Sequence, residues 1–118
     1  MILDKPPTIV IPGRPVAKQR ARTSHGRTYT PPRTRQYEET VAWTCRATKE
    51  RFRTGNLSVR IMLYSTTELR GDVDNYAKSI LDGMEKGQLI GNDRQVKDLR
   101  VGREIGPTDE ARVWVEAL

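Results

Sequence analysis

The sequence predicts an α+β fold in a single domain, with a mixed β-sheet and two main helices. Residues 57–64 alternate between apolar and polar side chains, which is typical of a half-buried strand. Residues 74–86 repeat apolar side chains at intervals of three and four, which is typical of an amphipathic helix. A chain of 118 residues without an internal repeat has room for one modest core.

The other elements follow from shorter patterns and give the order β-α-β-α-β-β. A β-branched run before Pro12 and Gly13 predicts a first strand, and two alternating runs near the end predict the last two. The expected strands are residues 8–11, 57–64, 96–104 and 111–116, and the expected helices are residues 34–52 and 74–86. Trp114, on the opposite face of the last strand, is a candidate contact with a second subunit or a helix.

The first helix should bury one apolar face. Tyr37, Val41 and Cys45 recur at its helical spacing. We therefore expect Cys45 to be a small buried hydrophobe and not a reactive thiol.

The composition excludes several classes of protein. There is no apolar run long enough to cross a membrane, and the first residues lack the pattern of a secretory signal. A single cysteine excludes an internal disulfide framework and fits a reducing cytoplasm. One histidine and one cysteine provide neither a zinc site nor a nucleophile–base pair.

Charge is distributed unevenly along the chain, whose net charge is +6. Residues 1–60 carry a balance of +9 and residues 61–118 a balance of −3. This division suits a protein that binds a polyanion with one half and cuts it with metal-binding acids in the other. Basic charge alone also suits a nucleic-acid-binding module without catalysis.

Residues 14–35 contain many basic residues and no acid, and their prolines and Gly26 argue against regular structure. One interpretation is a solvated or disordered arm. The other is a DNA-gripping loop that is mobile in the free protein. The candidate DNA-binding residues are Arg14, Lys18, Arg20, Arg22 and Arg27, whereas His25 is expected to be a surface histidine.

The stretch GDVDNYAKSILDG contains acidic residues and a lysine at intervals that bring their side chains to a common side. Asp72 and Asp74 point to the same side of an extended segment. Lys78 follows one helical turn later, and Asp82 one turn after that. Carboxylates are ligands that Mg²⁺ prefers, and a nearby lysine can stabilise phosphate charge. The structural alternatives are a helix cap for Asp74, a solvated loop acid for Asp72 and a turn residue for Asp93.

These motifs resemble the RusA-type Holliday junction resolvases, small endodeoxyribonucleases common in phages and prophages. The resemblance rests on DVDNYAK (residues 72–78), NDRQVKDLRVGRE (residues 92–104) and the spacing between them, with weaker support from GRTYTP (residues 26–31). It covers about three quarters of the chain and implies that residues 1–118 form one RusA-like domain.

The resemblance implies a homodimer that uses Mg²⁺, with Mn²⁺ as a substitute, to cut two of the four strands of a DNA junction in recombination or repair. The essential acids, which hold the metal, fall on Asp72, Asp74 and Asp93, and the active-site lysine falls on Lys78. Many members carry two consecutive acids where this chain has Asn92 and Asp93, so one accessory carboxylate is replaced by an amide.

Two further positions are interpreted in the light of this family. Arg103 stands where members often have lysine, which preserves the charge. Asp82 is interpreted as an i,i+4 partner that ties Lys78 in place, in preference to a metal ligand.

Two alternatives remain open from the sequence. One is a metal nuclease for flaps or other branched DNA. The other is a non-catalytic basic DNA-binding protein in which the acids are caps and turn residues. The chain is expected to be cytoplasmic, with no membrane partner and no small-molecule cofactor. The resemblance adds a bacterial, phage or prophage origin and branched DNA, the four-way junction, as the partner.

Overall fold

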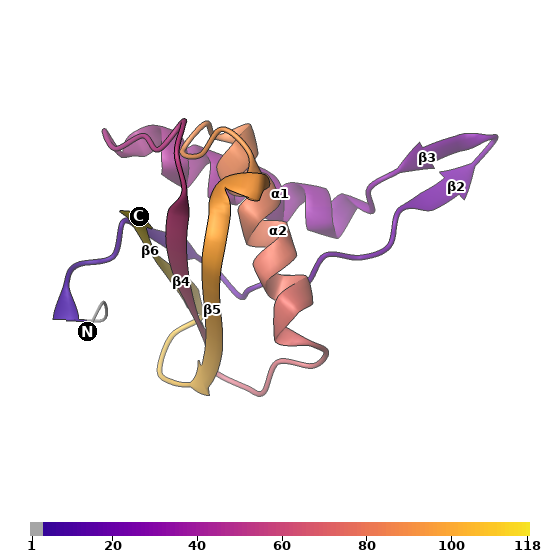
Figure 1. Ribbon diagram of the computed structural model, residues 1–118. Helices are drawn as coiled ribbons and strands as arrows, with labels where there is room; N and C mark the ends of the chain where they lie inside the picture. The colour runs from indigo at the N-terminus through magenta and orange to yellow at the C-terminus, as the bar shows by residue number, and fades with distance from the viewer. Residues whose placement is uncertain (1–3) are drawn as a thin grey trace.

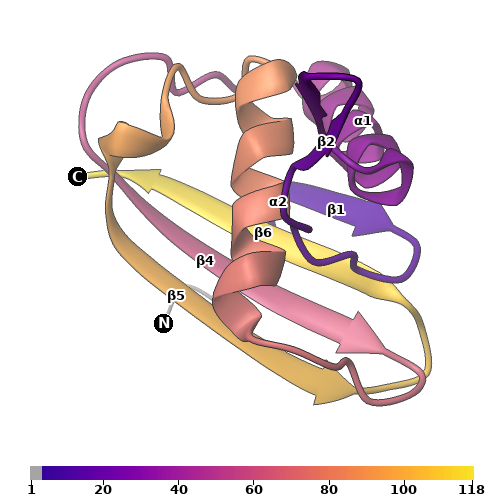
Figure 2. The same cartoon turned by 90° about the vertical axis from the view of Figure 1, so that its right-hand side faces the viewer.

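A four-stranded mixed sheet carries two helices on one face in the computed structural model, which describes residues 4–118 (Figures 1 and 2). The sheet order is β1-β6-β4-β5. Its strands are β1 (Ile9–Pro12), β4 (Leu57–Ser65), β5 (Val96–Ile105) and β6 (Glu110–Ala117), and the helices are α1 (Pro32–Ala47) and α2 (Val73–Lys86). The α+β class and the order of the six main elements are confirmed.

Strand β4 lies at the centre of the fold. It pairs antiparallel with β6 and parallel with β5, so that Ile61 lies between Val113 and Val101. A parallel pair needs a long crossover connection, and α2 provides it. Val59, Ile61 and Leu63 are buried in the core, as the alternation of β4 predicts. The crossover brings the chain from the end of β4 directly into the acidic stretch.

The two helices approach each other closely. A Cβ atom on Gly83 of α2 would lie only 2.5 Å from the Cβ of Val41 and 2.9 Å from the backbone oxygen of Glu38. Glycine therefore allows α1 and α2 to pack backbone against backbone. Tyr37, Val41 and Cys45 are buried on the face of α1 that was expected to be apolar.

Helix α1 ends five residues before the predicted boundary at residue 52. The Arg51 guanidinium donates to the backbone oxygens of Cys45 (3.2 Å) and Thr48 (2.8 Å), which satisfies carbonyl groups at the end of the helix. Phe52 instead forms a bridge with Ile90. A partner 38 positions away therefore overrides the local helical pattern.

The basic segment contains a β-hairpin, which contradicts the prediction that it lacks regular structure. Strands β2 (Arg22–Ser24) and β3 (Arg27–Tyr29) pair antiparallel and project from the body of the molecule (Figure 1). His25 and Gly26 have φ values of 51° and 77°, as a type I′ hairpin turn requires. His25 is exposed, as predicted, and every residue of both strands is exposed as well.

Trp114 is only 5% exposed, so little of its side chain is open to solvent in one subunit. Its indole N–H donates to the backbone oxygen of Lys5 at 2.8 Å. The segment before β1 therefore covers it, and Trp114 lines a pocket together with Ala47 at the end of α1. Within residues 4–118, no helix is long and apolar enough to cross a membrane.

Candidate active site

Asp72 and Asp74 lie at the N-terminal end of α2. Asp72 occupies the N-cap position, with Asp74 in the first turn, and both are exposed. Asp72 makes no capping hydrogen bond, and neither carboxylate has a hydrogen-bond or ion-pair partner within residues 4–118. The proposed role of Asp74 as the helix cap is therefore wrong. Two unpartnered carboxylates are available to a cation here.

The loop that presents Asp72 is held from two directions. Gly71 has a φ of +88°, which favours glycine. The Arg103 guanidinium, from β5, donates to the backbone oxygens of Gly71 (2.7 Å) and Leu69 (3.3 Å). The Tyr76 hydroxyl, from α2, donates to the backbone oxygen of Arg70 at 2.6 Å. Sequence reasoning gave neither Arg103 nor Tyr76 this role in positioning Asp72.

Asp93 begins the 3₁₀ helix η2 (Asp93–Gln95), immediately before β5. Its backbone N–H donates to Glu85 Oε1 of α2 at 2.5 Å. Asn92 caps the short helix: its Oδ1 accepts from the Arg94 N–H, and Gln95 Oε1 accepts in return from the Asn92 N–H at 2.9 Å. The Asn-x-x-Gln spacing of a capping box could have indicated this arrangement from sequence.

Lys78 connects α2 to Asp93. Its Nζ lies 3.1 Å from Asp82 Oδ1 and 3.1 Å from Asp93 Oδ2. Hydrogen bonds to Asp82 and Asp93 raise the pKa of Lys78 above its usual value, so the side chain is an ammonium ion at neutral pH. The prediction that Asp82 pairs with Lys78 across one helical turn is confirmed.

The three candidate metal-binding acids do not form one closed cluster. Asp74 lies in the first turn of α2, whereas Asp93 is held further along the helix, through its carboxylate by Lys78 and through its backbone N–H by Glu85, which lies eleven positions and a rise of about 16 Å after Asp74. No group of three or more acidic, histidine or cysteine side chains in residues 4–118 is placed to hold a metal ion. The pair Asp72 and Asp74 nevertheless fits a hard divalent cation, because Mg²⁺ often takes one or two carboxylates and completes its shell with water and phosphate.

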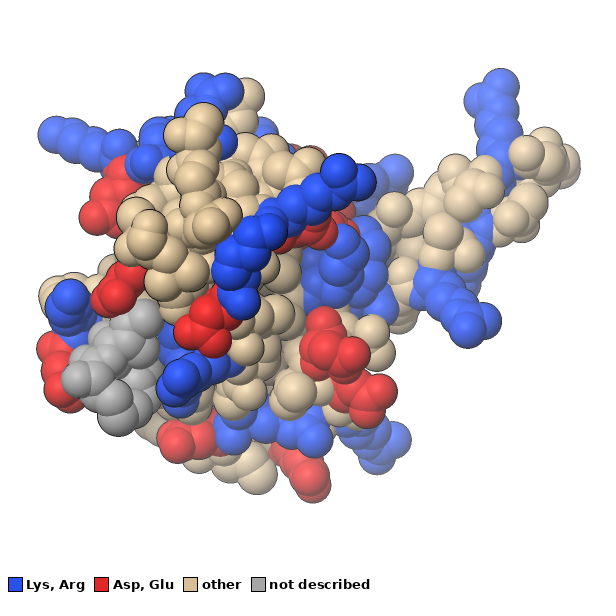
Figure 3. All heavy atoms as spheres, in the orientation of Figure 1, with Lys and Arg blue, Asp and Glu red and all other residues tan. Residues whose placement is uncertain are grey.

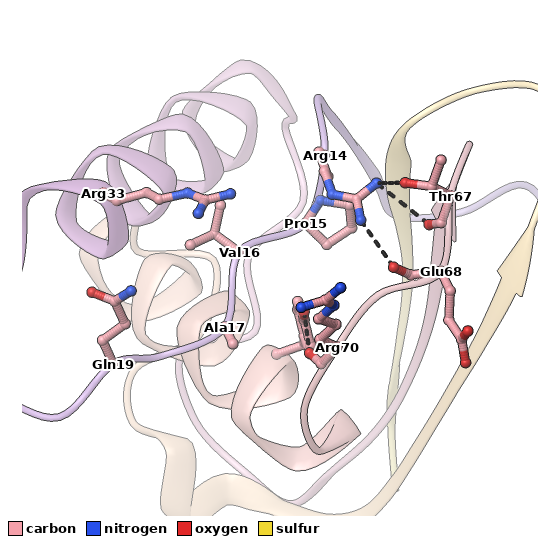
Figure 4. A pocket seen from close by; sticks show the side chains of 10 residues that line it. Arg14, Pro15, Val16, Ala17, Gln19, Arg33, Thr67, Glu68 and Arg70 are labelled. Atoms are coloured by element: carbon pink, nitrogen blue, oxygen red, sulfur yellow. Dashed lines mark hydrogen bonds between the residues drawn. The ribbon is translucent and has the colours of Figure 1, made fainter.

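A cleft of about 600 Å³ borders the acid-bearing loop (Figure 4). Arg33 from α1 and Arg70 from the loop line it, together with Tyr76. Within the described residues 4–118, the guanidinium groups of Arg33 and Arg70 have no hydrogen-bond or ion-pair partner. This arginine cleft therefore offers two unpartnered cations next to the loop that leads to Asp72. Sequence reasoning included Arg33 in the basic segment but named neither arginine as a DNA-binding residue.

The five predicted DNA-binding residues fall into two groups. Arg14 is bound inward: its guanidinium donates to Thr67 Oγ1 at 2.9 Å and to the Glu68 backbone oxygen at 3.1 Å (Figure 4). Lys18 is also bound inward, in ion pairs with two carboxylates. Arg20, Arg22 and Arg27 are exposed on the projecting residues 20–29, which we call the arm. Figure 3 shows basic side chains along this arm.

Comparison with known proteins identifies the family. Residues 12–116 match the family described as Endodeoxyribonuclease RusA. The chain belongs to this family. It is also 30% identical over 95 residues to the "Crossover junction endodeoxyribonuclease RusA" of Aquifex aeolicus (strain VF5), an alignment that covers 77% of this chain and 73% of the relative.

Membership of the RusA family confirms the resemblance and places the chain among the endodeoxyribonucleases. The matched range extends from the end of β1 almost to the end of β6. It therefore includes the carboxylate pair, Lys78, Asp93 and the arm. The chemistry of the site can accordingly be considered as phosphodiester hydrolysis in DNA.

Proposed function

We propose that this RusA-family protein is a Mg²⁺-dependent, structure-selective endodeoxyribonuclease that resolves four-way DNA junctions by paired hydrolysis, in recombination or repair. The observation that carries the proposal is the unpartnered pair Asp72 and Asp74 beside the charged Lys78. The name of the Aquifex aeolicus relative, a crossover junction endodeoxyribonuclease, supports the choice of substrate.

In this proposal Asp72 and Asp74 would hold the metal, with Asp93 as the third acid. A bound divalent ion polarises the scissile phosphate and activates water. Lys78 contributes a fixed positive charge, which binds a phosphate oxygen or orients the attacking water. A phosphate that takes the Lys78 ammonium would release the Asp93 carboxylate from its 3.1 Å contact. Asp93 would then be free to turn toward the other two acids.

DNA would approach across the basic surfaces that are not bound inward. The arm offers Arg20, Arg22 and Arg27, and the arginine cleft offers Arg33 and Arg70. Arginine suits both places because its planar guanidinium matches phosphate geometry. Because the cleft borders the loop that ends at Asp72, a strand held there would pass close to the carboxylate pair.

A cleavage assay tests this function. Labelled four-way junction, flap and linear duplex are incubated with the protein without metal, with Mg²⁺ and with Mn²⁺. We expect cutting of the junction in two opposed strands, only when metal is present. Preferred cutting of the flap would favour a nuclease for other branched DNA, and binding without cutting would favour a non-catalytic DNA-binding protein. Either result would overturn junction resolution as the function.

We also propose that the active form is a homodimer. Each subunit carries one group of site acids, whereas resolving a junction requires two symmetry-related nicks, as a twofold dimer would provide. Exposed apolar side chains are available for such a contact on α1 (Trp43, 69% exposed) and on the edge strand β5 (Ile105, 66% exposed).

Mixed dimers test the assembly. Wild-type and Asp72→Asn subunits carrying different tags are combined and isolated as heterodimers, then incubated with a supercoiled cruciform plasmid. The wild-type dimer should linearise the circle, whereas a heterodimer with one active site should only nick it. Sedimentation as a monomer together with efficient linearisation would contradict the dimer.

A further inference from the structure

A continuous chain of ion pairs connects the base of the arm to Lys78. Glu38 Oε2 of α1 lies 2.6 Å from Lys18 Nζ, which also lies 2.9 Å from Asp82 Oδ2 of α2. The other oxygen of Asp82, Oδ1, lies 3.1 Å from Lys78 Nζ. Lys18 and Lys78 therefore bind the same carboxylate through different oxygens, which fixes how that carboxylate is turned.

The Lys18 end of this chain is rigidly placed. The Lys18 backbone N–H donates to the Asn75 backbone oxygen at 2.8 Å, and Ser79 Oγ donates to the Val16 backbone oxygen at 2.6 Å. The segment before the arm is thus laid along the first turns of α2. The Lys18 backbone cannot move away from α2 without breaking these contacts.

The Glu38 end is buried. Only 2% of the Glu38 side chain is exposed, and its second oxygen accepts from Lys86 at 2.9 Å. A carboxylate removed from water requires cationic partners, and its pairs are screened much less than surface pairs. Burial lowers the pKa of Lys18, but hydrogen bonds to Glu38 and Asp82 outweigh burial and leave the pKa above its usual value. Lys18 is therefore charged at neutral pH.

We propose that Lys18 is a positioning residue for DNA cleavage: anchored by Glu38, it orients the Asp82 carboxylate, which holds the Lys78 ammonium beside Asp93. This proposal rests on the proposed function, because it assumes that Lys78 acts on the phosphate. It removes Lys18 from the set of DNA-contacting residues. It also links the base of the arm to the site, because Lys18 precedes the arm and Glu38 belongs to the helix that follows it.

Lys78 requires a fixed acceptor because a solvent-exposed ion pair between neighbouring helical turns is weak. The Lys78 side chain is 48% exposed, so its contact with Asp82 alone would leave the ammonium free to adopt other rotamers. With Lys18 absent, Asp82 loses the partner that fixes its Oδ2, and Lys78 loses a defined acceptor. A small displacement of a group that acts on the reacting atoms can cost much of the rate.

Single-turnover cleavage of a four-way junction at saturating enzyme separates positioning from DNA binding. Lys18→Met should slow this rate by about tenfold. Junction affinity, measured with Asp72→Asn added to prevent cutting, should change little, whereas Arg20→Met should weaken it. The matched control is Lys49→Met, which removes an exposed lysine outside the network and should leave the rate unchanged.

A double-mutant cycle tests whether Lys18 acts through Lys78. In a Lys78→Met enzyme, Lys18→Met should slow the residual cleavage by less than about twofold, because the group that it positions is already gone. Lys18→Arg, which keeps the charge, should restore part of the rate. An equal slowing in both backgrounds would overturn the proposal.

A second variant distinguishes slow cleavage that results from unfolding from slow cleavage that results from lost positioning. Lys18→Met leaves buried Glu38 with fewer partners and could unfold the protein. Lys18→Met combined with Glu38→Met removes both ends of that pair and should recover the melting temperature while cleavage stays slow. Recovery of the rate, or a wild-type rate in Lys18→Met itself, would overturn the positioning role. A wild-type protein that binds junctions without cutting them would instead overturn the proposed function.

Discussion

The carboxylates along helix α2 exist in two contrasting states. At the N-terminal end, Asp72 and Asp74 are exposed and unpartnered within residues 4–118. Further along, Asp82 is 20% exposed and is shared between Lys18 and Lys78, and the same Lys78 holds Asp93 of η2. The unpartnered acids are available to an external cation, whereas the paired acids already have protein cations. Helix α2 thus separates two exposed acids that are open to a cation from Asp82, which holds Lys78 in place; in the proposed function Asp93 joins the exposed pair once a phosphate takes the Lys78 ammonium.

The basic residues before α1 show the same contrast. Arg14 and Lys18 are bound to backbone oxygens and carboxylates of the protein itself, while Arg20, Arg22 and Arg27 extend into solvent on the arm. A cation that is already paired gains little by meeting a phosphate. The net charge of the basic half therefore overstates the number of residues that are ready to bind DNA.

The largest expected effect comes from the unpartnered acids. Asp72→Asn and Asp74→Asn replace an anionic oxygen by a neutral group of similar shape, so each should reduce junction cleavage on the order of 100-fold or more. Both side chains are exposed and make no hydrogen bond or ion pair within residues 4–118, so the free energy of unfolding should change by less than about 0.5 kcal/mol. Cleavage assays and urea unfolding measure the two effects.

Two matched variants sharpen this comparison. Glu104→Gln removes an exposed acid from β5 and should leave cleavage at the wild-type rate. Asp82→Asn should slow cleavage less than Asp72→Asn does but should lower stability more, because two lysines lose a partner. Equal effects of Asp72→Asn and Glu104→Gln would remove the metal assignment.

Lys78→Ala should lose most of the activity while metal still binds. In the proposed function the change removes the positive charge that acts on the phosphate, and it also removes the cation that pairs with Asp82 and Asp93. Metal affinity should therefore stay constant or rise. Titration calorimetry with Mn²⁺ and single-turnover cleavage measure the two quantities, and unchanged turnover would exclude a catalytic role for Lys78.

The core of the fold was predictable because it depends on local sequence patterns in which apolar and polar residues are clearly distinguished. The alternation of β4 and the spacing of apolar residues in α2 placed both elements within a residue of their observed bounds. The acids of the loop and the pairing of Lys78 with Asp82 followed from helical geometry. These features need only the neighbours of a residue in the sequence.

The features that sequence reasoning missed depend on partners that are distant in the sequence, or lie in segments without an apolar pattern. The hairpin has no buried face, so no apolar alternation marks β2 or β3. The inward pairing of Lys18 depends on Glu38 and Asp82, which lie 20 and 64 positions later in the chain. The early end of α1 depends on the contact between Phe52 and Ile90. None of these partners could be chosen before the sheet and helices were assembled.

A smaller effect is expected from the arm. Replacing Arg20, Arg22 and Arg27 with Gln should weaken junction binding and flatten its dependence on salt, because each lost phosphate contact changes the slope of log K against log salt by about 0.9. The control, with Arg46, Lys49 and Lys97 replaced by Gln, removes the same charge from exposed positions elsewhere. Identical slopes for the two triple variants would show that the arm does not contact DNA.

The smallest expected effect is a loss of stability at alkaline pH. The buried thiol and the paired lysines contribute to this loss in different pH ranges. Burial raises the pKa of the Cys45 thiol from its ordinary 9.0 to about 12. Above pH 9 the unfolded thiol ionises while the folded thiol keeps its proton, so stability should fall by roughly 1–2 kcal/mol between pH 9 and about 10.5. Cys45→Ala should be less stable at neutral pH but should lack this part of the decline.

The paired lysines contribute to the loss of stability at higher pH than the thiol does, and a different variant tests their contribution. Because the pKa values of Lys18 and Lys78 are raised, their contribution to stability is complete below about pH 10 and is lost as the pH rises through the folded values. Asp82→Asn removes the partner that the two lysines share, so it should reduce the decline above pH 10.5 and leave the decline from pH 9 in place. Urea unfolding at pH 7, 9, 10.5 and 11 measures both. Identical alkaline profiles for Asp82→Asn and the wild type would show that the shared carboxylate does not hold either ammonium in the folded protein.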